Sequence, residues 1–197
     1  MIQGLQSRWN RWLSRRIPPA KNLRLSQRQI FIIPSRVGAM FILALILMLL
    51  AAINYQNSLA YGLTFLLGSV FIVAILHTYL NLSGLMLKSG PAEPVFVGEH
   101  ARFNVRLESE RRAHEAIGLG WPSQGMLKLD VAALSGSDVE LGLPAPSRGW
   151  LRPGRVRVES RFPLGILVAW SWVDLDLQLL VYPRPVEGDL PIGAGLG

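Results

Sequence analysis

The residues with the clearest chemical potential in this sequence are its three histidines, which could act as metal ligands or proton carriers. His114 and Glu115 form the first half of the H-E-x-x-H pattern, in which two histidines bind zinc and the glutamate is a general base. The second histidine is missing here. His77 and His100 share no local pattern with His114, and the chain has no cysteine, so the sequence predicts no metal site.

Other catalytic patterns are also missing from the sequence. It contains no Gly-Lys-Ser/Thr phosphate loop, no G-x-S-x-G nucleophile turn and no dinucleotide-binding glycine pattern. We therefore expect a protein that is not an enzyme and uses no cofactor. A hydrolase built from dispersed residues is the alternative.

The elements that would position any site begin with two long apolar runs joined by a short polar bridge, residues 54–57. Each run is uncharged and has about the 20 residues needed to cross a bilayer core of about 30 Å. Four residues are a typical connection between antiparallel helices, and Asn57 can cap the second helix. The pattern predicts a transmembrane hairpin over 34–80, with spans at about 34–53 and 58–77. Two buried helices of a soluble core are the alternative, but soluble helices of this length nearly always show a polar stripe.

The distribution of charge predicts the orientation of the hairpin. Eight basic residues precede or open the first span: Arg8, Arg11, Arg15, Arg16, Lys21, Arg24, Arg28 and Arg36. The bridge has no charge, and no acidic residue appears before Glu93. By the positive-inside rule, the N-terminus and everything after the second span are expected in the cytoplasm, with the bridge outside.

Residues 1–33 are interpreted as a basic cytoplasmic leader. Leu5, Trp9, Trp12 and Leu13 fall on one helical face, as in an amphipathic helix that lies on an anionic membrane. A disordered leader that only sets topology is an equally good interpretation.

The net charge of +7 does not indicate nucleic-acid binding, because the charge is unevenly distributed. Nine of the 20 Lys and Arg residues lie in residues 1–92, which have no acid, whereas the rest of the chain has eleven basic and thirteen acidic residues. The basic excess lies beside the predicted membrane. We expect membrane lipids, and no nucleic acid, among the partners.

Small residues recur every four positions on the second apolar run, at Ala60, Thr64 and Gly68. Such a stripe lets another helix approach closely. The first run of the same hairpin is the favoured partner, and a dedicated oligomer interface is the alternative. His77 is interpreted as a boundary residue at the cytoplasmic end of the second span.

Beyond about Pro91 the periodicity changes from helix to strand. In ARFNVRLE, Phe103, Val105 and Leu107 alternate with polar residues, and about eight such segments follow one another, separated by Gly and Pro. This pattern is typical of an antiparallel β-sandwich, Ig-like in architecture, which we place at 92–186. A Gly-rich tail, 187–197, follows.

Several stretches of the sequence resemble the N-terminal half of bacterial membrane proteins of domain-of-unknown-function family 58. They are RQIFIIPSRVGAMF, INYQNSLAYGLTFLL, LHTYLNLSGL, SRGWLRPGRVRVESRFPLGILVAW and LVYPRP. The residues that carry the resemblance, and which we take as candidate structural or functional positions, are Asn54, Tyr55, Asn57, His77, Asn81, Arg148, Gly149, Arg161, Phe162, Pro163, Leu164 and Gly165.

The resemblance implies a two-span anchor in the bacterial inner membrane, a cytoplasmic β-sandwich and a partner, a MoxR-type AAA+ ATPase, together with other membrane proteins. We expect a non-enzymatic interaction or assembly module; an accessory subunit of a transporter or cell-envelope synthesis complex is the alternative. Family members continue into a von Willebrand factor A-like region, which this sequence lacks. We interpret the chain as a fragment or truncated gene product, and a naturally short family member is the alternative. Asp130, Ser135 and Ser137 have the residue types of that region's metal site, but the spacing is wrong for it.

Overall fold

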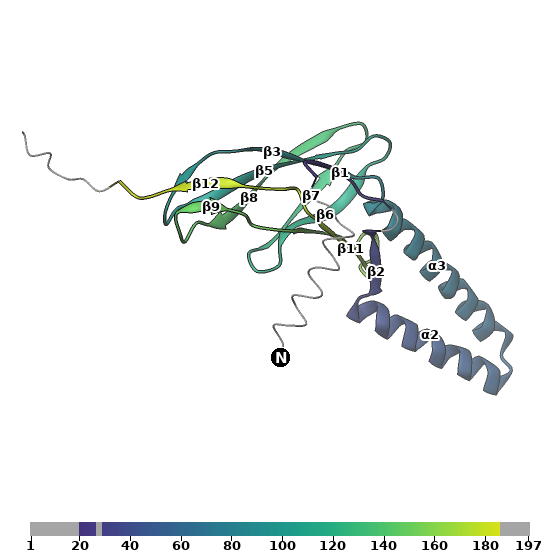
Figure 1. The fold of residues 1–197 in the computed structure, drawn as a ribbon. Helices are drawn as coiled ribbons and strands as arrows, with labels where there is room; N and C mark the ends of the chain where they lie inside the picture. The colour runs from purple at the N-terminus through teal and green to yellow at the C-terminus, as the bar shows by residue number, and fades with distance from the viewer. Residues whose placement is uncertain (1–19, 27–28, 186–197) are drawn as a thin grey trace, which may run out of the picture.

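The computed structural model describes residues 20–26 and 29–185, which form a β-rich unit with two long helices protruding from one end (Figure 1). The helices are α2 (Arg36–Tyr55) and α3 (Ser58–Leu82). The strands are β1 (Asn22–Arg24), β2 (Phe31–Pro34), β3 (Met86–Ala92), β4 (Val95–Phe96), β5 (His100–Glu108), β6 (His114–Trp121), β7 (Gly125–Val131), β8 (Gly136–Pro144), β9 (Gly149–Leu151), β10 (Val156–Ser160), β11 (Leu167–Val173) and β12 (Leu179–Tyr182).

The two helices begin where side chains satisfy their free N–H groups. The Ser35 hydroxyl accepts from the Gly38 N–H (3.1 Å) at the start of α2, and Asn57 Oδ1 accepts from the Leu59 N–H (3.0 Å) at the start of α3. Gln56 ends α2 in the left-handed conformation. The predicted spans therefore correspond to helices, although α3 continues five residues past the predicted end at 77.

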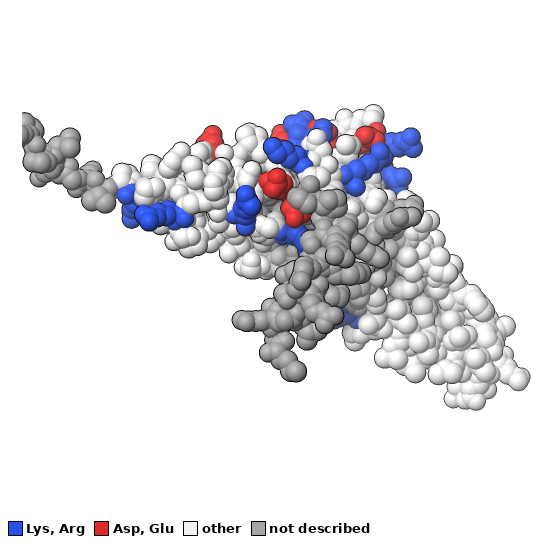
Figure 2. Space-filling view, in the orientation of Figure 1, with Lys and Arg blue, Asp and Glu red and all other residues white. Residues whose placement is uncertain are grey.

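Both helices are long and apolar enough to cross a membrane by length and composition. Their outward side chains, among them Met40, Leu47, Leu59 and Phe65, are exposed. Figure 2 shows an uncharged surface over the hairpin, whereas Lys, Arg, Asp and Glu gather on the β-rich unit.

The strands form three sheets, nearly all of whose pairs are antiparallel. Sheet A has the order β1-β3-β5-β8, sheet B the order β2-β11-β10-β6-β7, and sheet C the order β4-β12-β9, in which β4 and β12 are parallel. Alternate residues of β5 and β11 are buried, as the period of two requires. Phe103 of sheet A meets Trp121 of sheet B edge to face at 6.0 Å in the common core. The prediction of two apolar helices combined with an antiparallel β-sandwich is confirmed at this level.

Three predicted boundaries differ from the structure. Residues 22–24 and 31–33, assigned to the leader, form β1 and, together with Pro34, β2; these strands pair with β3 and β11. The β-rich unit includes β3, which starts at Met86 and not at 92. The alternation of Leu175, Leu177, Leu179 and Val181 in the sequence predicts a strand from 175, but β12 begins only at Leu179, although Leu175 and Leu177 are buried. The predicted leader helix in residues 5–13 and the tail at 187–197 lie outside the described residues.

Candidate functional site

Three stretches that carry the family resemblance meet where the helices join the β-rich unit. The start of α2, the end of α3 and the turn Arg161–Gly165, here called the RFPLG turn, come together at this place. We call it the junction, and it is the strongest candidate site in the described part of the chain.

The start of α2 is hydrogen-bonded to the RFPLG turn and to the residue after it. The Ser35 hydroxyl donates to the Gly165 carbonyl oxygen (2.7 Å), and the Ser35 N–H donates to the Ile166 carbonyl oxygen (2.9 Å). Gly38 lies so close that a Cβ there would be 1.9 Å from the Ile166 oxygen. Only glycine therefore allows this contact between helix and backbone.

The end of α3 is held by the Asn81 side chain, which is 6% exposed. Its Nδ2 donates to the Glu115 carbonyl oxygen (2.7 Å) and to the Ser160 hydroxyl (2.7 Å). Its Oδ1 accepts from the Glu115 N–H (2.9 Å). The amide thus pairs with both backbone groups of one residue, as a neighbouring strand would.

A β-bulge in β6 explains why Glu115 needs this partner. His114 pairs with Val131 and Ile117 with Leu129, so Glu115 and Ala116 together oppose the single residue Asp130. Ala116 has a positive φ of 50°, and its N–H donates to Asp130 Oδ1 (2.7 Å). The bulge removes Glu115 from the hydrogen-bonded ladder, and the Asn81 side chain bonds its free backbone N–H and carbonyl groups. The Asp130 carboxylate stabilises the bulge by accepting from the Ala116 N–H.

Ser160 connects Asn81 to the RFPLG turn. Its hydroxyl oxygen also accepts from the Phe162 N–H (3.3 Å). The turn is closed by the Gly165 N–H, which donates to the Arg161 carbonyl oxygen (2.8 Å), and Gly165 has a φ of 69°, which favours glycine. The Phe162–Pro163 peptide bond is cis. A series of short contacts therefore runs from the end of α3 to the start of α2.

His114 is buried below the same helix end. Its Nδ1 lies 2.6 Å from the Asn81 carbonyl oxygen, which can only accept, so Nδ1 carries the proton. This bond satisfies a carbonyl that the helix end leaves free. Burial lowers the pKa of His114 below its usual value, despite the opposing effect of this bond. The arrangement favours a neutral imidazole with a structural role.

The remaining resemblance residues do not join the junction. Asn54 and Tyr55 are exposed at the hairpin tip, where Asn57 caps α3. His77 is exposed on α3. Arg148 and Gly149 are exposed at β9, which Figure 1 shows near the end of the β-rich unit that is remote from the helices.

The residues of the small-residue stripe on α3 have different surroundings in the structure. Thr64 is buried, and its hydroxyl donates to the Ala60 carbonyl oxygen (2.7 Å). A Cβ at Gly68 would meet nothing within 4 Å, so Gly68 provides no close approach inside the chain. The helices instead contact through a stacked pair, Phe41 and Phe71, with centroids 5.8 Å apart, and Ala52 is buried.

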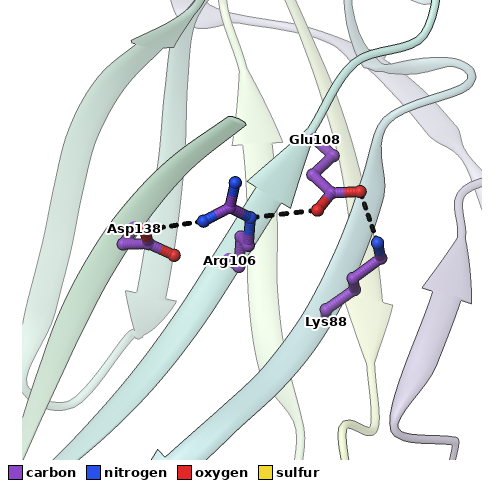
Figure 3. Close-up of polar contacts among 4 residues, drawn as sticks. All are labelled: Lys88, Arg106, Glu108 and Asp138. Atoms are coloured by element: carbon purple, nitrogen blue, oxygen red, sulfur yellow. Dashed lines mark hydrogen bonds and ion pairs between the residues drawn. The ribbon is translucent and has the colours of Figure 1, made fainter. Parts of the chain in front are cut away.

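An ion-pair cluster on sheet A was not singled out from the sequence (Figure 3). Glu108 bonds Lys88 (2.5 Å) and Arg106 (3.0 Å), and Arg106 also bonds Asp138 (2.9 Å). The hydrogen bond from Lys88 is the main cause that lowers the pKa of Glu108. In β5 the charged residues Arg102, Arg106 and Glu108 alternate with apolar residues. This pattern could have predicted a strand with one charged face. Because the pairs are solvent-exposed, they contribute little stability.

Within residues 20–26 and 29–185, no three His, Asp or Glu side chains lie close enough to hold a metal ion. Comparison of the chain with protein-family models, curated proteins and solved structures found no match. The family resemblance and the roles it implies therefore remain predictions.

We predict that Gly38→Ala destabilises the junction, because the new Cβ overlaps the Ile166 carbonyl oxygen and overpacking costs about 1–3 kcal/mol. Gly68→Ala is the matched control, since it adds the same methyl group to an apolar helix where space is open. Thermal unfolding of the purified chain in detergent, followed by tryptophan fluorescence, measures both. Equal melting temperatures for the two variants would contradict the close contact.

We also predict that acid weakens the fold through His114. The pKa of its folded state lies below the usual value of 6.5, so its contribution to stability is complete above about pH 6.5. It is lost as the pH falls from there through the lowered pKa, because the unfolded chain binds the proton more readily.

The test is denaturant unfolding between about pH 7.5 and pH 5. His114→Gln should flatten the decline in unfolding free energy, whereas His100→Gln, at an exposed position, should leave its slope unchanged. A slope that is the same in wild type and His114→Gln would rule out this role.

Proposed function

We propose that the protein is a non-enzymatic, membrane-anchored interaction module. The observation that carries the proposal is the junction: two apolar helices, whose one Lys, Arg, Asp or Glu residue is Arg36 at the start of α2, are hydrogen-bonded at both of their domain-facing ends to a β-rich unit. Such an arrangement suits an anchor that holds a binding domain in a fixed orientation. Burial of apolar surface in lipid would supply the energy of anchoring.

The charge pattern supports a location in the bacterial inner membrane with both termini in the cytoplasm. Arg36 opens α2, Arg24 pairs with Met86, four residues after the end of α3, and the tip carries no charge. Lys and Arg beside a span favour the cytoplasmic side. The β-rich unit would then be a cytoplasmic domain.

The strand order supports the finer assignment of an Ig-like sandwich. Ig sheets place strand B between A and E, and in variable-type domains extend the other sheet to C′-C-F-G. The orders β3-β5-β8 and β7-β6-β10-β11 follow the same succession if β3 is taken as strand A. Domains of this architecture commonly bind protein partners through loops at the sandwich ends.

The family resemblance favours a MoxR-type AAA+ ATPase as the partner, with other membrane proteins in the same assembly. The convergence at the junction of Asn81 and the RFPLG turn, which both belong to the resembling stretches, supports the resemblance on which this partner depends. The alternative is an accessory subunit of a transporter or cell-envelope synthesis complex. The unfilled space beside Gly68 favours this alternative, because a second membrane protein could pack there.

We predict that a reporter fused after Pro185 is active in the cytoplasm and that one inserted at Gln56 is active outside. The reason is the basic excess beside the first span and the uncharged tip. Paired alkaline phosphatase and fluorescent-protein fusions measure the two locations. Phosphatase activity after Pro185 would reverse the orientation and remove the cytoplasmic ATPase from the possible partners.

We further predict that an AAA+ ATPase co-purifies with the full chain after mild detergent extraction. Gly68→Leu is the informative variant, because its Cβ would point into open space on α3, where no atom from the rest of the chain lies within 4 Å. ATPase recovery should be the same with wild type and Gly68→Leu. Recovery of a polytopic protein that Gly68→Leu abolishes would favour the accessory-subunit alternative.

A further inference from the structure

The segment after the RFPLG turn lies between the two helices. Ile166 and Leu167 form a small apolar cluster with Ala74 of α3, separate from the main core, and Phe71 packs against it. On the other side, the Ile166 backbone contacts Gly38 of α2. Figure 1 shows the helices diverging from the tip toward this place.

The distance of these contacts from the hairpin tip, measured along the helices, gives their depth in the membrane that the hairpin would span. At about 1.5 Å per residue, Gly38 is about 25 Å from the tip end of α2 at Tyr55. Ala74 is about 24 Å from the tip end of α3 at Ser58 by the same measure. Both distances are shorter than the bilayer core of about 30 Å, and helix tilt shortens the depth further. The contacts with Ile166 therefore fall inside the thickness that the hairpin would span.

The side chain at the outside of the turn is apolar and uncovered. Leu164 is 57% exposed, next to Gly165, whose carbonyl is bonded to Ser35. Val37 and Met40, on either side of Gly38 in α2, are also exposed and apolar. Exposed apolar side chains therefore occur both on the turn and on the helix start to which it is bonded.

The basic side chains next to the RFPLG turn suit an anionic lipid surface. Arg36 is exposed at the first position of α2. Glu159 bonds both Arg157 (3.0 Å) and Arg161 (3.5 Å), so this group of three keeps a net positive charge. Lys and Arg next to a bilayer are attracted by anionic headgroups.

We propose that the RFPLG turn is a membrane-penetrating wedge, in which Leu164 enters the acyl-chain boundary of the cytoplasmic leaflet and Arg36 and Arg161 contact anionic lipid headgroups. The proposal rests on the proposed insertion of the hairpin. It adds a lipid-binding surface on the β-rich unit itself, built from a loop that follows the end of α3 by about 80 residues in the sequence.

The absence of cysteine from the chain allows a direct test with single labels. The full chain carrying Leu164→Cys is labelled with an environment-sensitive fluorophore and reconstituted in vesicles of phosphatidylcholine and phosphatidylglycerol. Quenching is measured with acyl-brominated lipids and with aqueous iodide. Leu47→Cys, in the middle of α2, is the control for lipid contact, and Trp150→Cys, at exposed β9, is the control for water contact.

We expect brominated lipids to quench the label at position 164, and iodide to quench it at least about threefold less than the label at position 150. If position 47 is quenched by lipid while position 164 behaves like position 150, the wedge is wrong and the anchored hairpin stands. If position 47 is also open to iodide, the hairpin is not inserted, and both proposals fail.

Discussion

The attachment of the helices to the sheets depends on the hydrogen bonds of one side-chain amide, that of Asn81. A bulge removes Glu115 from the β6 ladder, and the amide donates to and accepts from that residue as a strand would. Because Asn81 is buried, loss of these partners would leave polar atoms unpaired at a cost of about 1–3 kcal/mol per group. The bulge and the helix end therefore require each other.

Ser160 extends this constraint to the other helix. Its hydroxyl is shared by Asn81 and the Phe162 N–H, and the turn that follows bonds Ser35 at the start of α2. Both domain-facing helix ends are thus fixed to one turn, while near the tip the helices are joined by a short connection. Ile166 and Leu167 lie between the helices and set the distance between their domain-facing ends. This explains why the helices diverge from the tip.

The sequence predicted the parts of the fold that depend on local patterns. Uncharged apolar runs and the cap at Asn57 located the helices, and alternation located most longer strands. The last turn of α3 was missed because Thr78 and Asn81 are polar, and the groups that satisfy Asn81, on Glu115 of β6 and Ser160 of β10, are distant in the sequence. The strands β1, β2 and β9 were missed because they are three or four residues long, too short to show a period. The partners of the junction, 34 to 130 positions apart, have no local signal.

The division of the resemblance residues between interior and surface limits where a partner can bind. The side-chain amide of Asn81 is fully occupied by bonds inside the chain, and the Gly165 carbonyl is bonded to Ser35. These residues orient the domain and have few groups free to bind another protein. Exposed resemblance residues remain at both ends of the molecule, with Tyr55 77% exposed at the hairpin tip and Arg148 and Gly149 at β9. Near the junction, His77 and Leu164 are exposed as well. Under the proposed insertion these last two lie beside the membrane, which leaves the remote end of the sandwich as the open resemblance site on the domain side. The junction between these two ends is the rigid connection that would keep such a partner at a fixed height above the membrane.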